Sequence, residues 1–220
     1  MQAYHFFFHG ADLSALSTGA LWWAQQGVLC VSDLHLGKSD RIARRGGPLL
    51  PPYENRDTLG RLADTVSHYN PKIVICLGDS FDDLAGQDAL AEEDHAQLAR
   101  LMAGRQWIWI EGNHDPGPIR VGGSHMGEYQ AENLTFRHVA DSGKNAEISG
   151  HYHPKARVAL RTTAITRPCF LIDSDRVVLP AFGAYTGGLR TSDPALQTLM
   201  QPQAIAVLTG HQALPVPMPR

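Results

Sequence analysis

Residues 28–39 read VLCVSDLHLGKS, an apolar stretch of strand-forming residues that runs directly into Asp33 and His35. Side chains alternate along a strand, so residues two positions apart project to the same side. We therefore expect Asp33 and His35 to point at one spot just beyond the end of a buried strand. A single pair of this kind also occurs at an ordinary loop start, so the rest of the chain decides its meaning.

The composition is that of an ordinary globular protein, with 220 residues, 43% of them hydrophobic and 19% charged. A chain of this length can bury a sizeable core within one domain. The formal net charge of −3 argues against a wholly basic surface for nucleic acid but leaves room for a local basic patch. The start, MQAYHFFFHGAD, lacks a positively charged leader, and no stretch approaches a membrane span. We expect a cytoplasmic protein whose first residues form a strand.

The three cysteines, Cys30, Cys76 and Cys169, lie far apart in the sequence and form no CxxC motif. This spacing does not describe a disulfide framework, so we expect buried thiols. Histidine is more informative, because several of the 11 histidines fall in glycine-bounded clusters.

Strand and helix patterns alternate in the first half of the chain and give way to short strands in the second. Helical spacing of apolar residues predicts helices within 55–70 and at about 89–103, and a third is expected at 192–199. We expect an α/β fold in which two sheets form a β-sandwich flanked by helices, as one domain over residues 1–220 with a loose proline-rich tail from about 213. Strand patterns lie at 21–24, 28–32, 72–79 and 106–115, and then at LTFRHV, AEISG, KARVAL, CFLID and RVVLP.

Three apolar strands end in polar residues where the chain turns: SDLH follows VLCV, GDSFDD follows KIVICL, and GNHD follows QWIWIE. In open α/β sheets, sites lie beyond the carboxyl ends of the strands, so these loops are expected to converge. The segment SGHYHP repeats the two-residue spacing with two histidines. The resulting candidate ligands are Asp33, His35, Asp79, Asn113, His151 and His153.

This set of oxygen and nitrogen donors, without thiolate, suits manganese, iron or zinc better than a structural zinc site. Six such groups exceed what one catalytic ion with open positions needs, so we expect two ions. Asp79, by its position, could bridge them at roughly 3.5–4 Å, the separation used to activate a hydroxide and stabilise in-line displacement at phosphorus.

The order D-x-H, GD, GNH(D), a lone His and GHxH, over residues 33–153, resembles the calcineurin-like metallophosphoesterase superfamily. The resemblance implies that superfamily's β-sandwich fold and a catalytic histidine, His114, which protonates the leaving oxygen or stabilises the transition state. His138 is the less typical member, because Val139 follows it where the superfamily has a small residue. The implied ligands are Asp33, His35, Asp79 and His153 for one metal, and Asp79, Asn113, His138 and His151 for the other.

A basic segment, GKSDRIARRGGPLLPPYENRDTLGRL (37–62), follows the first ligands. It supplies candidates for substrate contact, although a solvated loop is the alternative: Arg44, Arg45, Tyr53 and Arg56. Three acidic residues could support the site by hydrogen bonding. Asp115 could orient His114, and Asp82 and Asp83 could fix the GDSF loop, with simple loop capping as the alternative. Trp22 and Trp23 are expected in the core.

The segments SDLHLGK, RRGGPLLPP and LPAFGAYTGG together resemble the bacterial ligase-associated DNA damage response endonucleases, the phosphodiesterase M branch of the superfamily. The resemblance implies a manganese-dependent DNA endonuclease in DNA repair. It would use a metal-bridging hydroxide for in-line attack on phosphorus, and a ligase and a helicase would be its partners.

Two other functions stay open at this point. A small-molecule phosphoesterase, acting on a cyclic nucleotide or a lipid precursor, would use the same metals with a different pocket. The lipid branch typically has Arg in place of His114, which counts against it. A non-catalytic scaffold of the same fold would lack the catalytic histidine, whereas this chain has it.

Overall fold

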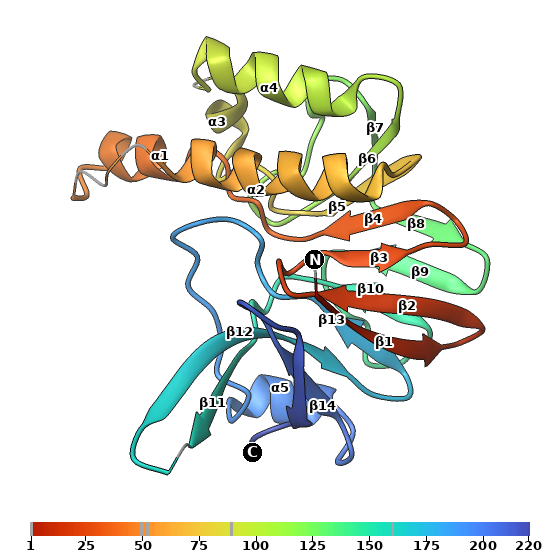
Figure 1. Cartoon of the computed structure of the whole chain (residues 1–220). Coiled ribbons are helices and arrows are strands. Elements are labelled where there is room, and N and C mark those ends of the chain that lie inside the picture. Colours follow the sequence, from red (N-terminus) through yellow and green to blue (C-terminus); the bar gives the residue numbers. More distant parts are fainter. Residues whose placement is uncertain (1, 49–50, 52, 89, 160) are drawn as a thin grey trace.

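Two β-sheets lie face to face, and helices cover the outer face of each sheet (Figure 1). The structure is a computed structural model, and it describes residues 2–48, 51, 53–88, 90–159 and 161–220. The predicted α/β sandwich is therefore confirmed.

The first sheet runs in chain order from β1 to β7. Neighbouring strands from β1 to β4 pair antiparallel, whereas those from β4 to β7 pair parallel. The parallel part brings the carboxyl ends of its strands to one edge of the sheet. The bounds are β1 (Ala3–Phe8), β2 (Ala11–Leu16), β3 (Leu21–Trp23), β4 (Val28–Val31), β5 (Ile73–Leu77), β6 (Gln106–Ile110) and β7 (Ser124–Met126).

The second sheet has the order β15-β14-β12-β13-β10-β9-β8, and β11 pairs with β12 beside it. Its strands β9, β10 and β13 are parallel neighbours, and the other pairs are antiparallel. The bounds are β8 (Glu128–Ala131), β9 (Leu134–Arg137), β10 (Glu147–Ser149), β11 (Lys155–Ala159), β12 (Ala164–Ile172), β13 (Arg176–Val178), β14 (Ile205–Leu208) and β15 (Leu214–Pro217).

The helices α1 (Lys38–Arg44), α2 (Glu54–Tyr69), α3 (Leu84–Asp88) and α4 (Glu92–Met102) follow strands of the first sheet, and α5 (Pro194–Leu199) belongs to the second. Alternate residues of β5 explain the layers, because Ile75 and Leu77 face the core between the sheets while Val74 and Cys76 face the helices. A third apolar cluster packs α5 on the outer face of the second sheet. The predicted helices correspond to α2, α4 and α5.

The helix α2 shows how the pattern produces the packing. Leu59, Leu62 and Val66 recur on one face and are buried against the first sheet. The helix ends at Asn70, whose left-handed conformation (φ 44°) is tolerated by Asn better than by most residues, and Pro71 follows.

One alternative and one expectation from the sequence differ from the structure. Lys38–Arg44, within the segment for which a loop was the alternative, forms α1, where Asp40 in the first turn pairs with Arg44 one turn later. The tail expected to be loose from about 213 forms β15, which pairs with β14 and leads to the buried Met218.

Two prolines explain why the sequence predicts a loose tail where the structure has a strand. Pro215 and Pro217 cannot donate to a ladder, but β15 is an edge strand, and the Met218 N–H, one position further on, bonds back to Ala204. Alternation therefore turns the proline nitrogens outward, where no donor is needed.

Cys30, Cys76 and Cys169 are buried and unpaired, as predicted. Within the described residues, no helix has both the length and the apolar character required to cross a membrane.

Candidate metal centre

The predicted ligands from both sheets meet at one place. Asp33 and His35 follow β4, Asp79 follows β5, and Asn113 follows β6. The second sheet contributes residues that follow β9 and β10: His138, His151 and His153. The His151 N–H donates to Asp33 Oδ2 at 3.0 Å, which ties the two sheets together at this edge.

The first donor group contains Asp33, His35 and His153, whose ligand atoms all lie within 4.8 Å of one another. His153 Nε2 lies 3.0 Å from Asp33 Oδ1 and 3.4 Å from His35 Nε2. Asp33 and His35 are buried and His153 is nearly so. The group is thus a small, enclosed set of one oxygen and two nitrogens.

The second donor group contains Asp79, His138 and His151 within the same 4.8 Å limit. His138 Nε2 is its centre, at 3.4 Å from Asp79 Oδ2 and 3.2 Å from His151 Nδ1. Asn113 Oδ1 lies 3.1 Å from the same nitrogen, and Asn113 is exposed to solvent. Asn113 can therefore complete this group at its open side.

Hydrogen bonding tests whether these residues fit metal ions. His35 Nδ1 donates to Asp82 Oδ1 at 2.7 Å, and His138 Nδ1 donates to the Leu77 carbonyl oxygen at 2.7 Å. Each neutral ring therefore presents an unprotonated Nε2 to the cluster. Asp33 Oδ1 is buried and accepts no hydrogen bond among the described residues. Converging lone pairs beside an unsatisfied carboxylate oxygen suit divalent cations.

The charges at the cluster also favour a bound cation. Burial raises the pKa of Asp79, but the hydrogen bond and charge of His138 outweigh it and hold that pKa well below its usual range. Burial lowers the pKa of His138, yet Asp79 and Asp33 raise it to about 8. A field that favours a proton on His138 also favours a metal ion, because both compete for one lone pair.

The backbone at the ligands differs from the extended form expected from the sequence. β4 ends at Val31, and five ligand candidates have left-handed backbone angles: Asp33 (φ 53°), His35 (φ 47°), Asp79 (φ 45°), His151 (φ 70°) and His153 (φ 46°). Such conformations cost non-glycine residues on the order of 1–3 kcal/mol each. The paired side chains do meet, but through strained turns and not through strand alternation.

The structure differs from the roles expected for Asp115 and Asp82. Asp115 is fully buried, and its Oδ2 accepts the N–H groups of Ser80 and Phe81 at 2.8 and 3.1 Å, so it fixes the GDSF loop. Burial and the charge of Asp79 raise the pKa of Asp115 to about 7. The Asp82 carbonyl oxygen accepts the Nδ1–H of His114 at 2.8 Å, so Asp82, and not Asp115, orients His114.

Asp82 also connects the cluster to α1. Its Oδ1 holds His35 as described, and its Oδ2 accepts from Arg41 at 2.8 Å. Burial raises the Asp82 pKa, but these hydrogen bonds lower it well below its usual range. His35, Asp82 and His114 form a third group of nearby donors, but both Asp82 oxygens are already engaged. We therefore interpret Asp82 as a support and not as a ligand.

His114 occupies the rim of the cluster. Its side chain is 32% exposed, and its Nε2 lies 4.0 Å from Asp79 Oδ2. Its backbone N–H donates to Asp79 Oδ1 at 2.8 Å. The ring is thus held on both sides, and Nε2 is its open atom.

The candidates for substrate contact in the basic segment differ in their surroundings. Arg44 pairs with Asp40 at 2.6 Å and Asp83 at 3.0 Å. Arg56 pairs with Glu93 of α4 at 3.4 Å. Arg45 and Tyr53 are exposed, Tyr53 by 64%. Much of the positive charge next to the cluster is therefore neutralised.

Asp83 acts as a loop cap, which was the alternative expected for it. Its Oδ1 accepts the Gly86 N–H at 2.7 Å, and both oxygens accept from Arg44.

Two glycines allow a close backbone approach at the site; the sequence indicates Gly112, beside the ligands, but not Gly183. A Cβ on Gly112 would lie 2.1 Å from the Asp79 nitrogen, and one on Gly183 would lie 2.1 Å from the Leu34 carbonyl oxygen. Gly183 belongs to the LPAFGAYTGG segment, and its N–H donates to the Asp33 carbonyl at 3.0 Å. For Gly183, its place in the LPAFGAYTGG segment was the only signal available.

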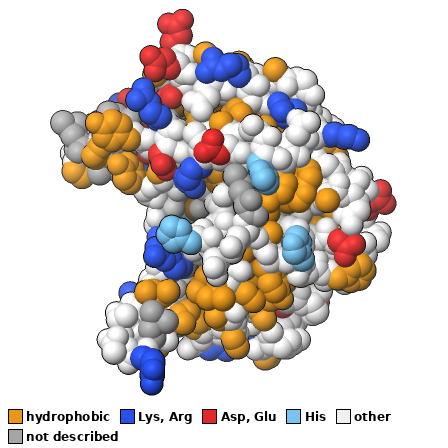
Figure 2. Space-filling model, viewed as in Figure 1, with side chains coloured by type: hydrophobic (Ala, Val, Ile, Leu, Met, Phe, Trp, Pro, Cys, Tyr) orange, Lys and Arg blue, Asp and Glu red, His pale blue; other side chains and the backbone are white. Residues whose placement is uncertain are grey.

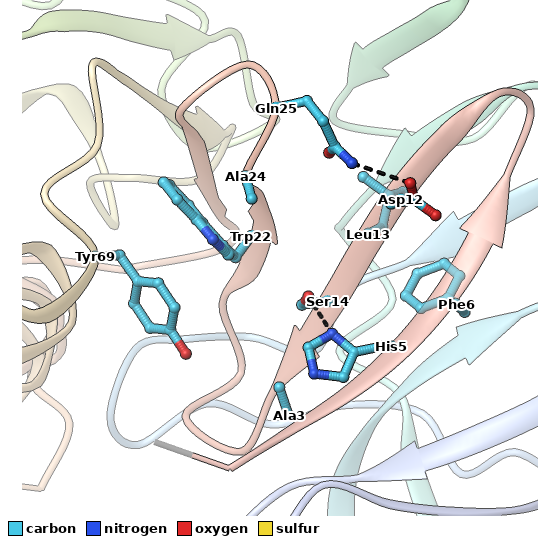
Figure 3. Close-up of a pocket in the computed structure, with 10 residues that line it drawn as sticks. All are labelled: Ala3, His5, Phe6, Asp12, Leu13, Ser14, Trp22, Ala24, Gln25 and Tyr69. Atoms are coloured by element: carbon cyan, nitrogen blue, oxygen red, sulfur yellow. Dashed lines mark hydrogen bonds between the residues drawn. The ribbon is translucent and has the colours of Figure 1, made fainter.

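Trp22 and Trp23 pack with the apolar clusters, as expected. Trp22 also lines a separate pocket of about 290 Å³, where its ring lies 5.1 Å from that of Tyr69 (Figure 3). Tyr69 ends α2, which leads directly into the start of β5, so this pocket lies away from the carboxyl ends that carry the ligands.

Fold and donor set together define a metal-dependent phosphoesterase, with a site suited to two divalent ions. The family model for calcineurin-like phosphoesterases matches residues 27–215, and the chain belongs to this family.

The crystal structure of Pseudomonas putida nuclease MPE is similar to this chain, with 25% sequence identity and a TM-score of 0.72. The match covers 97% of this chain and 100% of that chain. It is consistent with the resemblance to the ligase-associated endonuclease branch. A comparison with curated protein sequences found no significant match.

Proposed function

We propose that the protein is a DNA endonuclease that uses two divalent ions, Mn²⁺ foremost, and acts in DNA repair beside a ligase and a helicase in the cytoplasm. The main support is the pair of donor groups that converge at the carboxyl ends of both sheets, with His114 at their rim. The nuclease identity of the matched Pseudomonas putida structure supports DNA as the substrate. The absence of thiolate among the donors supports manganese.

In this proposal, Asp33, His35 and His153 would hold one ion, and Asp79 would complete its set. His138, His151 and Asn113 would hold the other, again with Asp79. When bound, such ions polarise phosphate oxygens and activate water for in-line displacement.

His114 would serve the leaving group. Its Nδ1–H donates to the Asp82 carbonyl oxygen, so Nε2 is the ring nitrogen left to face a substrate. A protonated Nε2 at the rim can donate to the departing alkoxide. Arg45 and Tyr53 remain predictions for substrate contact.

A small phosphodiester, such as a cyclic nucleotide, is the second candidate substrate. The ion pairs of Arg41 and Arg44 favour it, because they leave less positive charge beside the cluster for a DNA backbone.

The deciding experiment is Mn²⁺-dependent hydrolysis of circular single-stranded DNA by the purified protein, beside a cyclic nucleotide and a chromogenic diester. Cleavage of the circle identifies an endonuclease, since a circle has no ends. Turnover of the small diesters alone would replace the DNA proposal with a small-molecule phosphodiesterase.

His114→Ala is the accompanying variant. We expect roughly 10²–10⁴-fold lower turnover with two metal ions still bound, because acid–base assistance is lost while the ligands stay. His68→Ala, which removes an exposed histidine of α2, is the matched control. Unchanged turnover in His114→Ala would remove His114 from the mechanism.

A further inference from the structure

The β11–β12 hairpin projects from the body of the protein beyond the second sheet (Figure 1). Its two strands pair from Lys155 opposite Pro168 to Ala159 opposite Ala164. The first half of β12 pairs with β11, and only its second half, from Cys169, pairs with β14. The outer part of the hairpin is therefore a two-stranded arm.

The arm is strongly basic. Residues 155–172 contain one Lys, three Arg and no Asp or Glu. Arg157, Arg161 and Arg167 are exposed, and none of them forms an ion pair within the parts of the chain that the structure describes. The arginines of α1 differ in this respect, because Arg41 and Arg44 are held by aspartates.

Three cations share one face of the arm, whereas Arg167, opposite Ala156, lies on the other face. Lys155 and Arg157 are two positions apart on β11, and Arg190 is the bridge partner of Lys155, so all three share a face. The opposite face carries Ala156 and Val158, which pack on the α5 cluster. The basic face is therefore turned away from the core, and Arg161 lies in the turn between the two strands.

The row of cations begins at the metal centre. Lys155 is two residues beyond His153, and its amine donates to the Thr186 carbonyl oxygen at 3.0 Å. α1 starts three residues after His35, so both elements lead away from the same cluster. Figure 2 shows a recess between the α1 end and the projecting hairpin, with Lys and Arg side chains on the hairpin side.

We propose that the basic face of the β11–β12 hairpin, formed by Arg190, Lys155, Arg157 and Arg161, binds the phosphate backbone of the nucleic acid that the metal centre cleaves. This inference rests on the proposed DNA substrate. At about 3.3 Å per residue, β11 from Lys155 to Ala159 spans roughly 13 Å, or about four phosphates of one strand at 3.4 Å each along a helix axis. The arm thus extends the substrate contact beyond the reacting phosphodiester.

The chemistry of the face favours nucleic acid over a membrane. Surfaces that bind anionic lipid usually set large apolar side chains beside the cations. On this face the neighbours of Arg157 are Thr166, directly opposite, and the small Ala159. A polar row of cations matches a regular line of phosphates.

The test compares two double variants of the full-length protein. Arg157→Ala/Arg161→Ala removes two charges from the arm. Arg100→Ala/Lys144→Ala removes two exposed charges elsewhere, at the end of α4 and in the turn before β10. Both control positions precede parallel strands, so they lie at the edge opposite the metal centre. Binding of a labelled 30-nucleotide single strand is measured by fluorescence anisotropy from 50 to 300 mM salt, in a His114→Ala background and without added metal, so that cleavage is suppressed.

We expect the arm variant to reduce the slope of log affinity against log salt by about 1.4, because each lost phosphate contact contributes roughly 0.7 for a single strand. The same arithmetic gives up to about 25-fold weaker binding at 0.1 M salt. The control variant should keep the wild-type slope. Unfolding midpoints near that of the parent would show that both variants are folded.

An unchanged slope in the arm variant, or equal losses in both variants, overturns the inference. The inference is also overturned if the arm variant loses binding to phosphatidylserine vesicles but keeps its DNA binding, because that result would indicate a membrane-binding surface. Arm-dependent DNA binding by a protein that cleaves no circle supports the arm and contradicts the nuclease proposal. Cleavage of the circle with arm-independent binding overturns the arm alone.

Discussion

Asp82→Asn should weaken metal binding although it changes no atom in the proposed ligand sets. Both carboxylate oxygens are used, one by His35 Nδ1–H at 2.7 Å and the other by Arg41 at 2.8 Å. An amide has one oxygen and one NH₂, so whichever way it turns, one contact becomes donor against donor. His35 then loses its fixed tautomer, or Arg41 loses its partner in a buried setting.

Removing a carboxylate that orients a metal-binding histidine typically lowers metal affinity 10–100-fold, or about 1.4–2.7 kcal/mol. The adjacent Asp83 is the matched control, because its side chain is 24% exposed and Asp83→Asn can still accept the Gly86 N–H. The loss there is an ion pair with Arg44 and a longer one, at 3.9 Å, with Arg41. Such partly exposed pairs are worth about 0–1 kcal/mol each, and neither involves a ligand.

The assay is calorimetric titration of each metal-free protein with MnCl₂. Asp82→Asn should bind Mn²⁺ at least about 10-fold more weakly than the wild type, and Asp83→Asn within about twofold. Wild-type affinity in Asp82→Asn, or equal losses in the two variants, would refute the assignment of Asp82 as the support of His35.

Three further results are expected. Gly112→Ala places a Cβ 2.1 Å from the Asp79 nitrogen, so Asp79 must shift by about 1 Å. Turnover of a chromogenic diester should therefore fall at least about 100-fold. Wild-type turnover would disprove the close approach. Gly60→Ala, inside α2 with nothing within 4 Å, is its control and should raise the unfolding midpoint by about 2–4 °C. Deleting residues 214–220 removes β15 and uncovers the apolar cluster that buries Met218. The free energy of unfolding should fall by about 2 kcal/mol, and the unfolding midpoint in calorimetry by about 4–8 °C. An unchanged midpoint would mean that the tail is loose. Burial raises the pKa of Cys30, Cys76 and Cys169. A thiol reagent at pH 8 should therefore modify none of them in the native protein and all three after unfolding. Rapid modification of the native protein would contradict their burial.

Most of the fold could be predicted from the sequence where one physical signal dominated. The continuous apolar run of β5 is typical of a strand covered on both faces, and Leu59, Leu62 and Val66 carry the period of a helix. The positions of the ligand motifs at strand ends followed from the same runs. These signals are local, so a single sequence is enough to read them.

The features that could not be predicted depend on long-range contacts. Asp82 and Asp115 both lie in loops, and only the packing of those loops decides that His114 bonds to the main-chain carbonyl of Asp82 and not to the carboxylate of Asp115. β15 contains two prolines, and its acceptance as a strand depends on being at an edge. The basic arm is visible as composition, but the shared face of Lys155 and Arg190 comes from a bridge between distant segments.

The left-handed backbone at five ligand candidates has a consequence for how the centre is assembled. At about 1–3 kcal/mol each, the five conformations together store about 5–15 kcal/mol, as much as the whole net stability of a typical domain. The packing of the two sheets around these turns must offset this strain in the folded chain. The ligand positions therefore depend on core residues that touch no ligand. A core substitution that loosens this packing would let several turns relax to ordinary backbone angles at once, and several donor atoms would move together.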